Sequence, residues 1–141
     1  MKSIAAVIDT NVVVAALLTG DVNSPTARIL DGMCRGEFPF LLSTALLTEY
    51  REVLLRKKVR SLHGLSEHEV DSLLTALAAN AIVREPAHRD GAPDASDAHV
   101  WSLVESGKNC VLVTGDKLLL EHRPAKSQVV TPREFIDHLA K

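Results

Sequence analysis

Four carboxylates occupy positions at which a folded chain gains little from an isolated charge. Asp9 directly follows the first apolar run of the sequence, and Asp116 follows the most continuous later one. Glu49 and Asp97 fall on or beside the apolar stripes of two helical patterns. A buried carboxylate is costly unless it is hydrogen-bonded, paired or bound to a metal ion. The four acids are therefore candidates for a single acidic site.

Each of these acids also has a structural interpretation. Asp9 and Asp116 can cap the helical segments that follow them, because aspartate is a favoured N-cap residue. Asp97 can be a favourable charge in the first turn of a helix. Glu49 has no basic residue three or four positions further along, whereas Glu52 has Arg56 at that spacing and is expected to form a solvated ion pair.

Several acids in one pocket would repel and raise one another's pKa unless a cation lay between them. Hard oxygen ligands without histidine or cysteine suit Mg²⁺ or Mn²⁺ better than zinc. The six histidines have no HxxxH or HxH spacing and are expected on the surface or in loops.

The elements that must position the acids alternate between strands and helices. Strands are predicted at residues 4–8, 38–43, 82–83, 110–114 and 129–130. Helical patterns cover residues 11–18, 45–60 and 97–106, and capping signals open others at residues 24–25, 66–69 and 131–134. The alternation predicts an α/β three-layer sandwich with a mainly parallel sheet of four to five strands. Ligands of such sheets bind beyond the carboxyl ends of the strands, where Asp9 and Asp116 are expected.

Composition indicates a globular chain that forms one domain over residues 1–141. The hydrophobic fraction is 46% and the charged fraction 24%, and no apolar run approaches the roughly 20 residues needed to cross a membrane. Cys34 and Cys110 lie in apolar segments without CxxC spacing, which favours buried thiols in a reducing cytoplasm, with a single disulfide as the alternative.

One basic cluster stands out against a net charge of −2. It consists of Arg56, Lys57, Lys58 and Arg60. Either it binds a polyanion, or it is a solvated helix end favoured by the helix dipole.

Four segments of the sequence resemble the PIN-domain family of nucleases. They are VIDTNVVVAALL at residues 7–18, STALLTEYREVL at 43–54, PDASDAHVWSLVESG at 93–107 and VLVTGDKLLL at 111–120. Their order and spacing extend over essentially the whole chain. The resemblance implies a PIN-like fold, and the most similar subgroup is that of bacterial PIN proteins described as toxins of toxin–antitoxin modules.

The resemblance also implies roles for individual residues. The metal-binding and catalytic acids would be Asp9, Glu49, Asp97 and Asp116. The polar residues that support them would be Asn11, Thr114 and Asp94. Related sequences often have a further acid at the position of Ser96, so the main ligand on this side is either Asp94 or Asp97, and the helical face favours Asp97.

The implied activity is metal-assisted hydrolysis of RNA by an endonuclease that leaves a 5′-phosphate and a 3′-hydroxyl. Such a toxin would form a homodimer and bind an antitoxin. Leu47 and Leu55, outside the main apolar stripe, are either exposed residues that a partner covers or residues that make extra contacts with the core.

Two alternative functions remain. A PIN scaffold can serve as a binding module with a degraded site. A haloacid-dehalogenase-like phosphatase also carries an aspartate after its first strand, but that chemistry normally needs a second acid where this chain has Asn11. A response-regulator receiver is disfavoured because it needs an acidic pair there.

Overall fold

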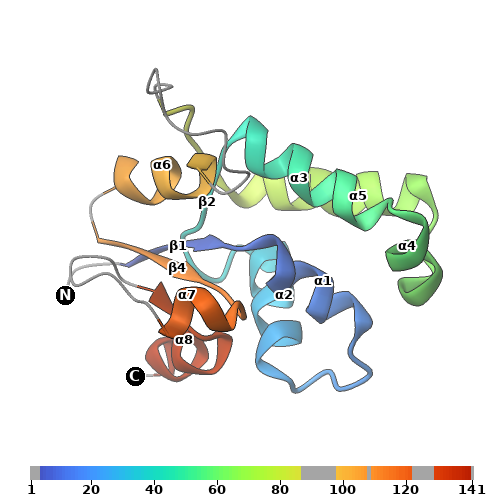
Figure 1. Cartoon of the computed structure of the whole chain (residues 1–141), viewed down its shortest axis with the longest axis horizontal. Helices are drawn as coiled ribbons and strands as arrows, with labels where there is room; N and C mark the ends of the chain where they lie inside the picture. Colours follow the sequence, from blue (N-terminus) through green and yellow to red (C-terminus); the bar gives the residue numbers. More distant parts are fainter. Residues whose placement is uncertain (1–3, 87–97, 108, 122–128, 141) are drawn as a thin grey trace.

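A mainly parallel sheet lies between two layers of helices (Figure 1). The computed structural model describes residues 4–86, 98–107, 109–121 and 129–140. Its strands are β1 (Ala5–Ile8), β2 (Leu41–Leu42), β3 (Ile82–Val83), β4 (Cys110–Val113) and β5 (Val129–Val130). Its helices are α1 (Thr10–Leu18), α2 (Pro25–Arg35), α3 (Thr44–Leu54), α4 (Lys57–His63), α5 (Glu67–Asn80), α6 (Ala98–Ser106), α7 (Lys117–Glu121) and α8 (Pro132–Leu139).

All strand pairs in the described residues are parallel, as the alternating pattern predicts. One group has the order β1-β4-β5 and the other pairs β2 with β3. A parallel bridge between Ala6 and Phe40 joins the two groups through β1 and β2. The predicted α/β fold with a mainly parallel sheet is therefore confirmed.

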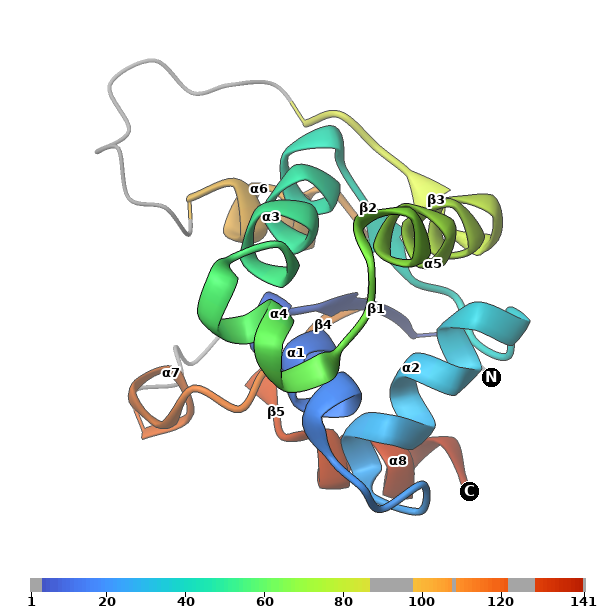
Figure 2. The ribbon, with the colours of Figure 1, turned by 90° about the vertical axis from the view of Figure 1, so that its right-hand side faces the viewer.

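The helices form one layer on each side of the sheet. In Figures 1 and 2, α3, α5 and α6 lie above β1 and β4, whereas α2, α7 and α8 lie below them. The core between the layers is mainly aliphatic. Its aromatic residues include Tyr50 and three phenylalanines, among which the ring of Phe38 packs against those of both Phe40 and Phe135. No helix in the described part of the chain is both long and apolar enough to cross a membrane.

Local capping signals identify the starts of three helices correctly. Ser24 caps α2, and Gly36 ends it in the left-handed conformation, with φ of 66°, which glycine adopts without strain. Ser66 opens α5 and Thr131 opens α8, each through the reciprocal hydrogen bonds of a capping box.

The single helix predicted at residues 45–60 is wrong, because the chain breaks between α3 and α4. Arg56 takes an extended backbone conformation, with φ of −59° and ψ of 135°. The carbonyl of Leu54 accepts instead from Nε2 of His63, at 2.8 Å, while Nδ1 of His63 accepts from the N–H of Leu65. Apolar periodicity continues through the break, so the sequence pattern does not reveal it.

The strand predicted at residues 38–43 is also too long. Only Leu41 and Leu42 form a ladder with β3, and Phe40 makes the isolated bridge. Pro39 has no N–H to donate, and only its carbonyl joins the sheet, by accepting from Ala6 N at 3.0 Å.

Leu47 and Leu55 are partly buried and pack against the core, which corresponds to the second of the two alternatives that the sequence leaves open. Other apolar side chains are exposed in the described part of the chain, among them Val22 on the α1–α2 connection and Leu118 on α7. Cys34 and Cys110 are both free thiols.

Candidate active site

The carboxyl ends of β1 and β4 lie side by side and carry the first residues of the site. Ile8 pairs with Val113 in the parallel register, so Asp9 and Thr114 leave the sheet next to each other. The hydroxyl of Thr114 donates to Oδ2 of Asp9 at 2.8 Å. Thr114 is completely buried, and this bond fixes the Asp9 side chain at the edge of the sheet.

Asn11 ties the same two strand ends together from the first turn of α1. Its Nδ2 lies 3.2 Å from Oδ2 of Asp9 and 3.2 Å from Oγ1 of Thr114. Its Oδ1 accepts from the N–H of Gly115 at 3.0 Å. The predicted supporting role of Asn11 and Thr114 therefore has a geometric counterpart in hydrogen bonds to Asp9.

Thr10 connects Asp9 with Glu49, although the two acids are 40 residues apart in sequence. The backbone N–H of Thr10 donates to Oδ1 of Asp9 at 2.9 Å, and its hydroxyl donates to Oε2 of Glu49. Glu49 is half-buried beside the α3 stripe of Leu46 and Tyr50, as the helical spacing predicts.

Tyr50 lies beneath the two acids and joins α3 to the end of β1. Its hydroxyl donates to the carbonyl of Ile8 at 2.5 Å. Complete burial raises the pKa of Tyr50 well above its ordinary value of 10.0, and the nearby carboxylates of Asp9 and Glu49 raise it further. The phenol therefore stays protonated at neutral pH and acts as a hydrogen-bond donor there.

Asp116 enters the site from the β4–α7 connection. Its backbone N–H donates to Oγ1 of Thr114 at 3.0 Å, which links it to the residue that holds Asp9. Its Oδ1 accepts from the N–H of Leu118 at 2.9 Å, at the start of α7.

The structure thus brings three of the four predicted acids to one edge of the sheet. Asp97, together with Asp94 and Ser96, lies outside the described residues, and α6 begins directly after it, at Ala98. Within the described residues, no three acidic, histidine or cysteine side chains already form a metal-binding group. The carboxylate oxygens of Asp9, Glu49 and Asp116 instead accept the hydrogen bonds given above.

The capping interpretation and the site interpretation of Asp9 and Asp116 are compatible. Asp9 is the N-cap residue of α1, and Asp116 accepts a backbone hydrogen bond at the start of α7. Capping engages one carboxylate oxygen of each residue and restricts its rotamers. Each capped acid is thereby held in a fixed orientation at the strand ends.

Three residues of this network carry no functional prediction from the sequence. Thr10 lies within the DTN motif, and the sequence marks Tyr50 only as part of an apolar stripe. The histidines are predicted on the surface or in loops, but Nε2 of His99 lies 3.2 Å from Oε1 of Glu49. The one sequence signal for His99 is its spacing of four residues before Leu103, which lies on the buried face of α6.

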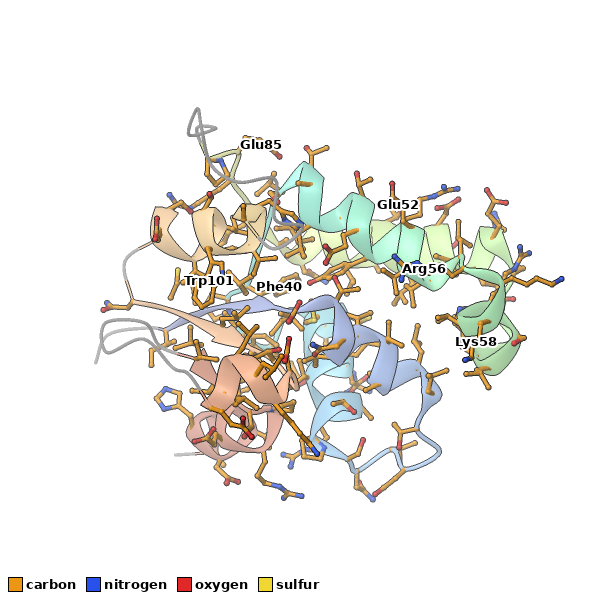
Figure 3. All side chains as sticks on the ribbon, in the orientation of Figure 1. Phe40, Glu52, Arg56, Lys58, Glu85 and Trp101 are labelled. Carbon is orange, nitrogen blue, oxygen red and sulfur yellow. The ribbon has the colours of Figure 1, made fainter. Side chains whose placement is uncertain are left out.

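The basic cluster lies at the corner where α3 ends and α4 begins, and Figure 3 labels two of its members, Arg56 and Lys58. Because the chain breaks at this corner, Arg56, Lys57 and Lys58 lie at the N-terminal end of α4, where the dipole of that helix disfavours cations, whereas Arg60 lies in its last turn. The dipole of α4 therefore favours Arg60 but not the other three residues. Among the described residues, the predicted ion pair between Glu52 and Arg56 is also not formed, since the two residues no longer share a helix.

A sequence model described as the PIN domain matches residues 5–118, from β1 to the first residues of α7. The chain belongs to the PIN-domain family. PIN domains are generally nucleases that use divalent metal ions, so nucleic acid is the class of substrate. A search of the curated proteins finds no match.

The PIN-domain match spans all four predicted acids, and β5 and α8 lie beyond it. It leaves the haloacid-dehalogenase alternative without support. Asn11, at the position where that chemistry would place a second acid, is used instead as a hydrogen-bond bridge between Asp9 and Gly115.

Proposed function

We propose that this PIN-domain protein is a Mg²⁺- or Mn²⁺-dependent endoribonuclease. The observation that carries the proposal is the hydrogen-bonded link between Glu49 on α3 and Asp9 and Asp116, which follow the carboxyl ends of β1 and β4. Acids from separate elements are joined there through Thr10 and Thr114. A structural role for each acid would not require them to converge.

The donor chemistry of this edge suits a hard divalent cation. Asp9, Glu49 and Asp116 supply carboxylate oxygens, and Asp97 would add a fourth acid from the residue before α6. Oxygen-rich sites of this kind favour Mg²⁺ and Mn²⁺ over zinc. When bound, the cation supplies an activated water and stabilises the charge that develops on the phosphate.

The chain's own residues supply orientation. Thr10, Asn11 and Thr114 donate to the carboxylates and limit their rotamers, which lowers the entropy lost when the site binds its ligands. Hydrolysis at this site would leave a 5′-phosphate and a 3′-hydroxyl, and it needs no side-chain nucleophile.

The test is cleavage of total RNA by the purified protein with Mg²⁺, with Mn²⁺ and with excess EDTA. We expect cleavage with either metal and none in EDTA, and we expect end-labelling to detect 5′-phosphate on the products. Metal-independent cleavage would contradict the proposed chemistry. If no RNA is cut under any condition, the alternative of a PIN scaffold that acts only as a binding module would be favoured.

We propose that Arg56, Lys57, Lys58 and Arg60 bind the phosphates of the same RNA. All four are exposed, and none forms an ion pair with another residue that the structure describes. Glu49 lies five residues before Leu54, the last residue of α3, which corresponds to about 7.5 Å along the helix axis, and Arg56 follows Leu54 by two residues. In this proposal the cluster, just beyond the end of the helix that carries Glu49, contacts phosphates next to the one that is cut.

The double variant Lys57→Ala/Lys58→Ala is expected to bind RNA more weakly and with less salt dependence. The slope of log affinity against log salt should become shallower by about 0.7 for each phosphate of single-stranded RNA that a lysine no longer neutralises. Filter binding across a salt series, with Ca²⁺ in place of Mg²⁺ to prevent cleavage, measures both quantities. Arg35→Ala/Arg133→Ala removes two exposed charges from α2 and α8 and serves as the matched control. Equal slopes for the wild-type and the lysine variant would contradict the role of the cluster.

We extend the proposal to the toxin of a cytoplasmic toxin–antitoxin pair that forms a homodimer and is covered by an antitoxin. The resemblance of the four motifs to bacterial PIN toxins supports this extension. The surface argument from Leu47 and Leu55 does not, because both residues pack against the core.

A further inference from the structure

Both oxygens of the Glu49 carboxylate are held by side chains from other helices. Oε2 accepts from the hydroxyl of Thr10 on α1, and Oε1 lies 3.2 Å from Nε2 of His99 on α6. The contact with His99 is largely shielded from water, since the side chains of His99 and Glu49 are 23% and 24% exposed. The carboxylate is therefore fixed from two directions rather than free to rotate.

A histidine at position 99 has an energetic disadvantage for folding. Its Nδ1 atom is buried and has no hydrogen-bond partner in the described structure. A buried polar atom without a partner destabilises the folded state, because it loses its hydrogen bonds to water. An apolar side chain would avoid this cost, because His99 lies one turn before Leu103, on the side of α6 that packs into the core.

The contact with Glu49 is the polar interaction that can offset this cost. Nε2 of His99 faces a carboxylate oxygen and so carries the donated proton. Thr10 makes the equivalent contact with the other oxygen, and Thr10 also donates to Asp9. His99 thereby extends the network around Asp9 to a third helix.

We propose that His99 is a positioning residue that presets the Glu49 carboxylate for binding a divalent cation. It acts by donating from Nε2 to Oε1 of Glu49, so less rotational freedom of that side chain is lost when the cation binds. The inference rests on the proposed function, since Glu49 must be a ligand for its orientation to matter.

Binding of Mn²⁺ alone, measured by electron paramagnetic resonance without RNA, tests this role. Loss of such a supporting hydrogen bond typically weakens metal binding by about 10- to 100-fold, and we expect this for His99→Leu. His99→Gln retains a donor at the reach of Nε2 and is expected to bind Mn²⁺ within a few-fold of wild type. His99→Met is a second donor-free variant of different shape, and His68→Leu on the exposed face of α5 is the matched control.

Unfolding in EDTA separates positioning from a purely structural role. Trp101, the only tryptophan, lies on α6 two residues after His99, and its fluorescence follows urea unfolding of this region. We expect His99→Leu to keep or increase the free energy of unfolding, because the unpartnered Nδ1 is removed. Undiminished Mn²⁺ affinity in both donor-free variants, or weakened affinity with no rescue in His99→Gln, would overturn the positioning role while leaving the proposed function intact. A wild-type protein that binds no Mn²⁺ and cuts no RNA would overturn both.

Discussion

Asp116→Asn, Asp9→Asn and Glu49→Gln are each expected to lower metal-dependent RNA cleavage by at least about 100-fold. Each substitution keeps the size and shape of the side chain and removes one negative charge. Metal affinity falls because the cation loses an anionic ligand. The rate of RNA cleavage at fixed Mg²⁺, measured with total RNA or an end-labelled transcript, gives the effect of each change.

Asp116→Asn is the most informative of the three variants, because it removes the negative charge and keeps the helix-capping hydrogen bond. Within the described residues, the side chain of Asp116 accepts one hydrogen bond, from the N–H of Leu118, and an asparagine oxygen accepts that bond equally well. Asp9→Asn is less clean, since Oδ2 of Asp9 accepts from both Thr114 and Asn11 and an amide nitrogen cannot accept from either. We therefore expect Asp9→Asn to be the less stable of these two variants.

The matched control is Asp31→Asn, which neutralises an exposed carboxylate paired with Arg35 on α2. It should retain wild-type activity. Raising the Mn²⁺ concentration should restore part of the activity of Asp116→Asn if the lost function is metal binding. An inactive Asp9→Asn that is also unfolded would instead favour the helix-cap interpretation of that residue, and full activity in a folded Asp116→Asn would remove Asp116 from the site.

The strand ends were the most predictable part of this site. An apolar run that ends in a polar residue identifies the carboxyl end of a buried strand, and the parallel pairing of β1 with β4 then places Asp9 beside Thr114. The starts of helices could be predicted from the sequence equally well, because capping is a local interaction. Ser66 with Glu69 and Thr131 with Glu134 form their capping boxes regardless of what surrounds them.

The contacts across elements were not predictable in this way. The partners of Glu49 are Thr10 and His99, which come from helices far away in the sequence. Periodicity places Glu49 at the edge of a buried face, but the identity of its partners depends on how α1, α3 and α6 pack. The break at Arg56 has the same origin, since the bond from His63 to the carbonyl of Leu54 forms only once the chain has turned back.

Tyr50 combines a predictable feature with an unpredictable one. Periodicity assigns it to the core, but the sequence does not reveal that it also donates a hydrogen bond to the strand that positions the site. We expect Tyr50→Phe to lower the free energy of unfolding by about 1–3 kcal/mol, since the Ile8 carbonyl loses the donor at 2.5 Å. Urea unfolding in EDTA, followed by Trp101 fluorescence, measures the change. Phenylalanine fills nearly the same volume, so a cavity contributes little to the result.

The raised pKa of Tyr50 also predicts how the free energy of unfolding changes at alkaline pH. The pKa of Tyr50 is raised in the folded protein, so its stabilising contribution is fully present below the ordinary value of 10.0 and is lost as pH rises from there toward the folded pKa. The stability difference between wild type and Tyr50→Phe should therefore be constant at neutral pH and shrink above pH 10.0. Lysine titration affects both proteins alike and cancels in this difference.

Direct observation of the phenol is possible because Tyr50 is the only tyrosine of the chain. The ultraviolet absorbance of tyrosinate follows its titration without interference from another tyrosine. In the folded protein the absorbance should rise only at a pH well above that of the urea-unfolded chain, and it should coincide with loss of structure, because the buried phenolate cannot donate to the carbonyl of Ile8. A tyrosine that titrates at its ordinary pKa in a still-folded protein would show that Tyr50 is accessible to water, and would contradict its place beneath Asp9 and Glu49.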